Sequence, residues 1–390
     1  MKVLKKTGKW LLIILVILNL AILVSGKTYI YKGVANTYLK GRSGPSISEY
    51  KIFDNRTVKA GAEQKWHAAK NYNSGKIPQE LQAHFDAMKT IAYVVVKNDS
   101  LLHEQYWDGY GADSHSNSFS MAKSFVSIMV GVAIDEGKIK SIDEPVGDFL
   151  PEFKEGNNAK LTIRHLLTMS SGINFDENYV SPLAYPAAAY YGSDLKKLTY
   201  GYKVTEEPGK KFKYLSGNSE LLAFILEKAT GMKLSDYMSE KLWKPLGAKN
   251  DAFWSLDHAD GVEKAYCCFN SNALDFARIG ELYLDTGKWN GNQLVSKDYV
   301  LNSIKPAELT NTEDENKNDR YGYAWWLIPD YKGHRIFYAR GILGQYIFCI
   351  PDQKMVVVRL GSKREKPSGT DHPADVYYYL DAALQMYGSR

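Results

Sequence analysis

The chain has 390 residues, of which 45% are hydrophobic and 24% are charged, a balance typical of a globular protein with a large core. The formal net charge is +5, but lysines 2, 5, 6 and 9 supply four of those charges, which leaves about +1 on the remainder. Because no basic run is interleaved with aromatic residues, the composition argues against a nucleic-acid partner.

The first 26 residues have the pattern of an export signal. A lysine-rich flank over residues 2–9 precedes an almost unbroken apolar run over residues 10–24. The run is short for a membrane span, and residues 24–26 form a weak cleavage site, so a cleaved signal peptide and an uncleaved membrane anchor through residues 10–25 both remain open. In either case we expect the body of the protein outside the cytoplasmic membrane, in the periplasm or the extracellular space.

The three cysteines are Cys267, Cys268 and Cys349. Adjacent cysteines rarely bridge each other and no C-x-x-C motif occurs, so neither a disulfide framework nor a zinc site is predicted. We expect three buried thiols, with a single Cys268–Cys349 disulfide as the alternative. The sequence predicts neither a metal site nor a cofactor.

The polar and mixed residues 27–75 are expected to form an N-terminal extension that packs on a main domain of residues 76–390. A helical pattern over residues 78–88 opens this domain. Two β-branched segments follow, at residues 91–97 and 101–107, with the composition and spacing of a β-hairpin.

The rest of the chain is expected to be mainly helical, with three strands near the C-terminus and a final helix. A helix is expected from Ser120 to near Gly137, whereas residues 173–202 show no clear periodicity and contain many tyrosines. A long irregular segment is usually functional, so we weigh a substrate-facing role for it against a structural one. The other expected elements are helices at 221–229, 234–242, 273–284 and 374–386, and strands at 335–340, 345–350 and 355–360.

This order of elements predicts an α/β (α+β) fold. Strands near both ends of the chain suggest one antiparallel sheet flanked by helices, with a helical subdomain inserted between them.

The chemistry is expected at the start of the first long apolar helix, where Ser120 and Lys123 form a Ser-x-x-Lys motif. Positions i and i+3 share a helix face, so the hydroxyl and the amine can meet. A serine hydroxyl needs a neighbouring base, and burial can keep a lysine neutral enough to act as one. Two fixed positions are common by chance, and an N-cap serine before a surface lysine is the structural alternative.

Three further segments follow in a fixed order. They are residues 142–151 with 161–172, Tyr214 ahead of the 221–231 helix, and Ala339-Arg340-Gly341 on a late strand. Together with Ser-x-x-Lys they resemble the serine β-lactamase and penicillin-binding-protein superfamily over residues 78–390. The similar branch is class C-like and includes D-alanyl-D-alanine carboxypeptidases, esterases and 6-aminohexanoate-oligomer hydrolases.

The resemblance implies a catalytic group of Ser120, Lys123 and Tyr214. In such a site the lysine and tyrosine together take the serine proton, and the tyrosine protonates the leaving group. The oxyanion would lie between the amides of Ser120 and Ile342. Substrate contacts are expected from Ser216, Arg340, Gly341 and Ile342.

Two departures from the family pattern concern β-lactam binding. Ser216 replaces the asparagine of Tyr-x-Asn, and Ala339 replaces the lysine of Lys-Thr-Gly, although Arg340 supplies a cation if it faces inward. We therefore expect an amidase or esterase acting on a small-molecule or peptide amide or ester. A β-lactamase or D-Ala-D-Ala carboxypeptidase acting on cell-wall peptides is the alternative.

Two other classes of protein have less support in the sequence. A Ser-His-Asp hydrolase lacks support because no G-x-S-x-G motif occurs, and His165 is expected to be a packing residue. A non-catalytic cell-wall binding protein or acylated sensor is disfavoured because the serine, lysine and tyrosine are all present.

Overall fold

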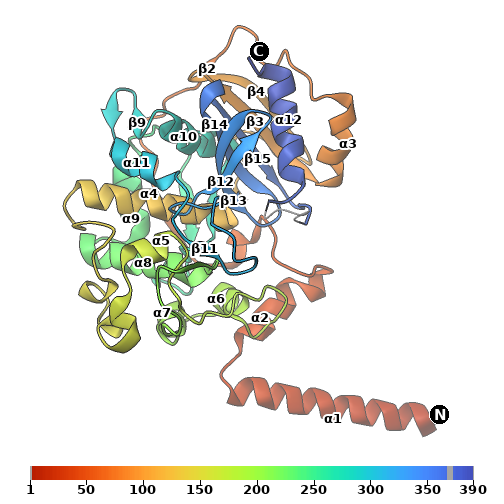
Figure 1. The fold of residues 1–390 in the computed structure, drawn as a ribbon. Helices are drawn as coiled ribbons and strands as arrows, with labels where there is room; N and C mark the ends of the chain where they lie inside the picture. The colour runs from red at the N-terminus through yellow and green to blue at the C-terminus, as the bar shows by residue number, and fades with distance from the viewer. Residues whose placement is uncertain (1, 367–371, 390) are drawn as a thin grey trace.

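The computed structural model describes residues 2–366 and 372–389. A mixed sheet of seven strands occupies one half of the body, in the order β12-β13-β14-β15-β3-β4-β2 (Figure 1). The strands are β2 (His67–Ala68), β3 (Thr90–Lys97), β4 (Ser100–Tyr106), β12 (Trp326–Tyr331), β13 (His334–Gly341), β14 (Gln345–Ile350) and β15 (Met355–Gly361).

The two ends of the chain meet inside this sheet, as predicted. β15 pairs antiparallel with β3, with Val358 opposite Val94, and β3 forms the expected hairpin with β4. Only the short β2 departs from the antiparallel pattern, since it runs parallel to β4. The edge strand β12 was not anticipated, because Pro329 and Asp330 interrupt its apolar pattern.

Both faces of the sheet are covered, so its central strands are largely apolar. Val94 and Val96 of β3 pack into one core cluster, and Tyr93 and Val95 pack into another on the opposite face. The second face is covered by α3 (Gln79–Ala87) and α12 (Asp375–Tyr387), whereas α10 (Ala273–Leu284) lies against the first. Burial on both faces explains the continuous β-branched runs.

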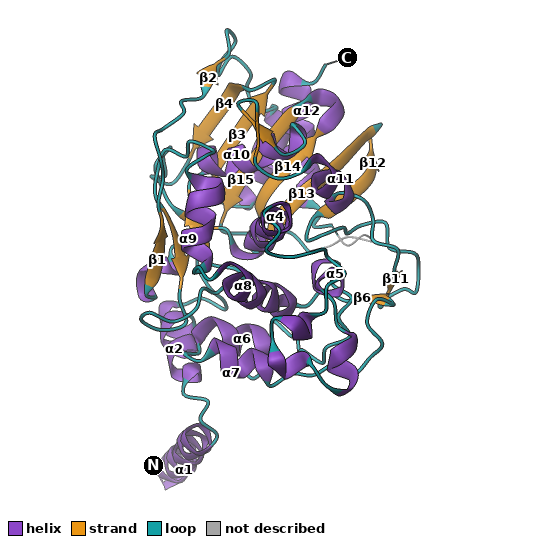
Figure 2. Cartoon of the chain, turned by 90° about the vertical axis from the view of Figure 1, so that its left-hand side faces the viewer, coloured by secondary structure: helices purple, strands orange, loops and turns teal. Residues whose placement is uncertain are grey.

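The helical subdomain lies between β4 and β12 in sequence, and Figure 2 shows α6, α7 and α8 below the sheet, with α4 between the sheet and α8. Its helices are α4 (Ala122–Asp135), α5 (Ile163–Leu167), α6 (Tyr185–Tyr191), α7 (Leu195–Tyr200), α8 (Ser216–Thr230), α9 (Leu234–Met238) and α11 (Lys297–Ser303). Minor strand pairs join β6 (Lys211–Phe212) to β11 (Thr310–Asn311), and β9 (Lys288–Trp289) to β10 (Asn292–Gln293).

The segment 173–202 is partly helical, which corrects the expectation of an irregular stretch. It contains α6, which starts at Tyr185 and Pro186, and α7, whose first turn is capped by the Asp194 carboxylate accepting from the Lys197 amide at 3.1 Å. Helices of seven and six residues are too short to show a 3.6-residue period, and packing stabilises them.

A second, smaller sheet ties the N-terminal extension to the main domain. Its strand order is β1-β7-β8-β5, where β1 is Asn55–Val58, β5 is Ser116–Asn117, β7 is Ala252–Ser255 and β8 is Phe269–Ser271. An ion pair of 2.7 Å between Arg56 and Glu263 adds to this connection. The extension thus packs on the body, while the boundary between residues 75 and 76 stays a prediction.

The N-terminal helix α1 (Lys2–Val24) projects from the body in Figure 1. Residues 7–24 are long and apolar enough to cross a membrane, with a mean hydropathy of 2.3, a test that a signal sequence also passes. The next helix, α2 (Tyr29–Asn36), packs against α6, and the Tyr29 hydroxyl donates to the carbonyl of Pro182 at 3.1 Å.

The expectation of three buried thiols is wrong for two of the cysteines. Cys267 and Cys268 form a disulfide between adjacent residues, while Cys349 is the buried thiol. The backbone makes this possible by turning sharply at Cys268, whose φ of +68° lies in the left-handed region. The alternative Cys268–Cys349 bridge is thereby also corrected.

Candidate active site

Ser120 lies in a short 3-10 turn, Phe119–Met121, that leads from β5 into α4. The preceding residue, Phe119, has a φ of +44°, and its amide donates to the Asn117 side chain at 2.8 Å. Bulky residues rarely adopt this conformation, and such local strain tends to occur at functional sites. The turn places the serine at the beginning of a buried helix.

Lys123 is 1% exposed and sits one helical turn after the serine. Its Nζ donates to Ser120 Oγ at 2.9 Å and to the carbonyl oxygen of Tyr266 at 2.7 Å. The same Nζ lies 5.1 Å from the centre of the Tyr214 ring. The fold therefore brings Ser120, Lys123 and Tyr214 together, although their sequence positions span nearly 100 residues.

Tyr214 is half-buried and lies just before α8. Its ring packs against Tyr321 and Trp326, with centroid distances of 6.1 and 5.5 Å. The guanidinium of Arg340 stacks 3.3 Å from the centre of the Trp326 ring. Arg340 therefore lies near Tyr214, because it stacks on Trp326, which packs against the Tyr214 ring.

Gly341 is needed for β13 to lie close to the serine turn. A Cβ at this position would stand 2.2 Å from the carbonyl oxygen of Ser118, which backbone atoms do not allow. This close approach brings the next residue, Ile342, to the cavity that Ser120 also lines. Gly341 and Ile342 are therefore placed beside the nucleophile candidate by the strand itself.

Ser216, expected to contact substrate, is held by a residue that the sequence analysis missed. Its amide donates to Glu177 Oε2 at 2.8 Å, and its hydroxyl donates to Glu177 Oε1 at 2.5 Å. The Tyr179 hydroxyl donates to the same carboxylate at 2.6 Å. These bonds fasten the 176–183 loop to the start of α8, and the abundance of tyrosines was its only sequence signal.

The segment that carries the carbonyl bound by Lys123 is flanked by two buried ionisable side chains, Glu220 and Lys264. Glu220, on α8, accepts from the Ala265 amide at 2.8 Å, and burial raises its pKa well above the usual range. Lys264 donates to the Ala189 carbonyl at 3.1 Å, and burial lowers the pKa of this lysine to about 7. Sequence patterns gave no signal for this arrangement, because the contact with Lys123 is made by the backbone of Tyr266.

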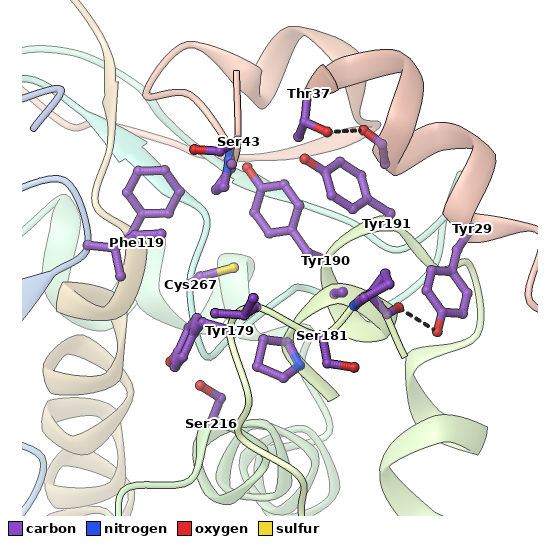
Figure 3. Close-up of a pocket in the computed structure, with 18 of the residues that line it drawn as sticks. Tyr29, Thr37, Ser43, Phe119, Tyr179, Ser181, Tyr190, Tyr191, Ser216 and Cys267 are labelled. Carbon is purple, nitrogen blue, oxygen red and sulfur yellow. Dashed lines mark hydrogen bonds between the residues drawn. The ribbon is translucent and has the colours of Figure 1, made fainter. Parts of the chain in front are cut away.

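Ser120 lines a cavity of about 160 Å³, and Figure 3 shows a close-up of its walls. Its walls combine the serine turn, α2, the 179–182 loop and α6, and Tyr179, Tyr190 and Tyr191 are prominent in them. The remaining lining residues are Tyr29, Ile30, Gly33, Val34, Thr37, Tyr38, Ser43, Gly44, Pro45, Phe119, Ser120, Val180, Ser181, Pro182, Pro186, Ala187, Ser216, Tyr266, Cys267 and Ile342. The tyrosine-rich segment therefore faces the candidate site.

The fold is that of a class of hydrolytic enzymes, and the comparisons with known proteins identify the family. The Beta-lactamase family model matches residues 79–381, so the chain belongs to the beta-lactamase family. The 6-aminohexanoate-dimer hydrolase of Paenarthrobacter ureafaciens is 27% identical over 298 residues, which cover 73% of this chain and 75% of that protein.

Solved structures share the fold. A Bacillus anthracis protein, provisionally assigned as a 6-aminohexanoate-dimer hydrolase, is 23% identical in sequence and superposes with a TM-score of 0.73. The superposition covers 87% of this chain and 93% of the Bacillus anthracis chain. A family VIII carboxylesterase is 17% identical, with a TM-score of 0.63. Its superposition covers 83% of this chain and 99% of the carboxylesterase chain. Together with the hydrolase relative in sequence, these similarities identify the protein as a hydrolytic enzyme.

Proposed function

We propose that the enzyme forms an acyl-enzyme on Ser120 and cleaves an amide or ester bond. The supporting observation is the 2.9 Å contact between Lys123 Nζ and Ser120 Oγ, with the Tyr214 ring beside the same nitrogen. A neutral lysine amine at this distance can accept the serine proton.

In the acylation step, Ser120 Oγ attacks the substrate carbonyl carbon while its proton passes to the Lys123–Tyr214 pair. The carbonyl electron pair moves to oxygen, and the amides of Ser120 and Ile342 would stabilise this oxyanion. When the intermediate collapses, the bond to nitrogen or oxygen breaks. The leaving group takes a proton from Tyr214 and departs as an amine or alcohol.

In the deacylation step, a water molecule gives a proton to the same pair and attacks the acyl carbon. The bond to Ser120 Oγ then breaks, and the serine oxygen recovers a proton from Lys123. A carboxylic acid is released and the residues return to their starting protonation.

The substrate is proposed to be a small-molecule or peptide ester or linear amide in preference to a β-lactam. Ser216 is engaged by Glu177, and Ala339 is buried where the family pattern has a lysine. A bicyclic carboxylate left without its usual cation would cost roughly 1–3 kcal/mol. Arg340 opposes this proposal, because it lies beside the Tyr214 group and carries the required charge.

We also propose that the body of the enzyme is exported, either released after cleavage or anchored by α1. The lysine-flanked apolar helix supports this location. The Cys267–Cys268 disulfide is compatible with it, because disulfides persist in oxidising compartments.

The decisive experiment combines a fluorophosphonate probe with two substrates. We expect rapid labelling of Ser120 in the wild type and none in Ser120→Ala, together with a higher kcat/KM for p-nitrophenyl butyrate than for nitrocefin. An unlabelled wild type would favour the non-catalytic binding or sensor alternative. A nitrocefin value more than tenfold above the ester would favour the β-lactamase alternative.

A further inference from the structure

The cavity beside Ser120 has no charged side chain in its lining that could pair with a charged substrate group. All 23 residues that line it are uncharged, and most are tyrosine, proline, glycine or aliphatic. A free ammonium or carboxylate group in such a site would lose its water and find no charged side chain in the lining itself, which is unfavourable. The chemistry of the walls therefore selects an uncharged, apolar part of the substrate.

The tyrosine hydroxyls do not make the cavity polar throughout. Tyr190 packs its ring edge against Phe53, and the hydroxyls of Tyr190 and Tyr191 lie close to Glu49. Burial, with the Glu49 carboxylate as the next cause, raises the pKa of both phenols. Figure 3 shows the two rings next to each other in the wall of the cavity, where they offer apolar surface.

The cavity includes Ser120 in its lining but does not include Tyr214. Ser120 and Ile342, which flank the proposed oxyanion, are both in its wall. Tyr214, the proposed donor to the leaving group, lies outside this lining and packs against Tyr321 and Trp326. The leaving group would thus be near Tyr214, and the acyl portion of the substrate would extend into the cavity.

From these observations we infer that the enzyme acts on esters or amides of an uncharged hydrocarbon acyl chain, and that this chain occupies the cavity between Ser120, α2 and α6. The inference rests on the proposed function of Ser120. The volume of about 160 Å³ resembles that of an apolar cavity of about 150 Å³ that accommodates benzene, so it suits a chain of about six carbons.

The mouth of the cavity fits an amphiphilic substrate. Among the lining residues, Val180 is 90% exposed and Tyr38 is 67% exposed, and Leu183, next to the lining, is 54% exposed. The wall formed by α2 directly follows the apolar helix α1, and the Tyr31 hydroxyl donates to Asn19 of α1 at 2.9 Å. An acyl compound that partitions into a membrane would meet this apolar mouth first.

The test uses the full-length protein in dioleoylphosphatidylcholine nanodiscs and fluorophosphonates carrying ethyl, butyl, hexyl or decyl chains. The second-order labelling rate of Ser120 should rise about fourfold for each added methylene up to hexyl and then level off. Equal labelling rates for the ethyl and hexyl probes would overturn the inference. Failure of every probe, including ethyl, would instead overturn the proposed function.

Two variants locate the chain. Ala187→Phe fills the cavity and should lower the ratio of hexyl to ethyl labelling rates at least tenfold, whereas Ala83→Phe, on the exposed face of α3, should leave both rates unchanged. Val180→Asp places a charge at the mouth and should lower the same ratio at least threefold, which keeps the test valid if Ala187→Phe fails to fold. An unchanged ratio in the folded variants would place the chain elsewhere and overturn the assignment.

Discussion

Lys123 is the residue on which the candidate site depends most directly. Its side chain is almost fully buried, and its Nζ is shared between Ser120 Oγ and the Tyr266 carbonyl. A buried amine held by two oxygens has a fixed position, and proton transfer benefits from such a fixed donor–acceptor distance.

Single changes in the proposed proton path should each remove most activity. We expect Ser120→Ala to lower kcat/KM for p-nitrophenyl butyrate by about 10³-fold or more, and Lys123→Ala and Tyr214→Phe to come close to that loss. Residues of one proton path act as a unit, so the Lys123→Ala/Tyr214→Phe double variant should be little worse than either single one. Fully additive losses would show that the two residues act separately.

Glu281 should make stability depend on pH. Burial, with the neighbouring Asp99, raises the pKa of Glu281 to about 9, whereas an unfolded glutamate titrates near about 4.3. Because the folded state then keeps the proton while the unfolded state releases it, this contribution to the free energy of unfolding falls between about pH 4 and pH 9. Urea unfolding of Glu281→Gln should show a weaker decline with pH than the wild type.

The matched control is Glu80→Gln, which changes an exposed glutamate on α3. Its curve should follow that of the wild type at every pH. Parallel curves for the wild type and Glu281→Gln would contradict the assignment of a protonated Glu281.

At the scale of elements, the site depends on how closely β13 approaches the turn before α4. The glycine at position 341 removes the side chain that would meet the Ser118 carbonyl. The strand and the helix start are thereby fixed relative to each other, and the two amides proposed for the oxyanion come from these two elements.

Gly341→Ala should separate these elements and lower both the stability and the turnover of the enzyme. We expect a loss of roughly 1–3 kcal/mol in the free energy of unfolding, as for other overpacked positions, and a fall in kcat of about 10-fold or more. The control is Gly111→Ala, because no atom lies within 4 Å of a Cβ there. Near wild-type kcat in Gly341→Ala would show that the approach of β13 is not needed.

Elements with a strong period or a motif could be predicted from the sequence. The hairpin of β3 and β4, the helix α10 and the strands β14 and β15 follow their apolar patterns closely. Ser120, Lys123 and Tyr214 were predicted together because a motif order links them, and the structure brings them together. Their catalytic roles stay a proposal.

Features that depend on tertiary packing could not be predicted. The helices α6 and α7 are too short to show a period, and β1 and β5 become strands only through partners far away in sequence. Glu177 binds Ser216 across 39 positions, and Tyr266 contributes through its backbone carbonyl. Neither contact leaves a pattern in the chain.

At the scale of the whole molecule, α1 stands apart from a compact body (Figure 1). The apolar window of residues 7–24 is not buried in the body, and it is long and apolar enough to cross a membrane. Because the lysines precede the apolar run, the body is expected on the outer side.

A topology reporter tests this orientation. Alkaline phosphatase fused after the C-terminus should be active, because that enzyme folds only where its disulfides form. A fusion to a fluorescent protein that matures only in the cytoplasm should stay dark. A bright cytoplasmic reporter with an inactive phosphatase would contradict export.

The Cys267–Cys268 bridge has a consequence for handling the protein at the bench. Because it joins neighbours, it closes no long loop and removes little freedom from the unfolded chain, unlike most disulfides. Dithiothreitol should therefore leave the melting curve nearly unchanged while altering the backbone that follows the Tyr266 carbonyl and the Cys267 wall of the cavity. A thermal shift assay would report such a sample as intact, and only a kinetic assay would reveal that its active site had changed.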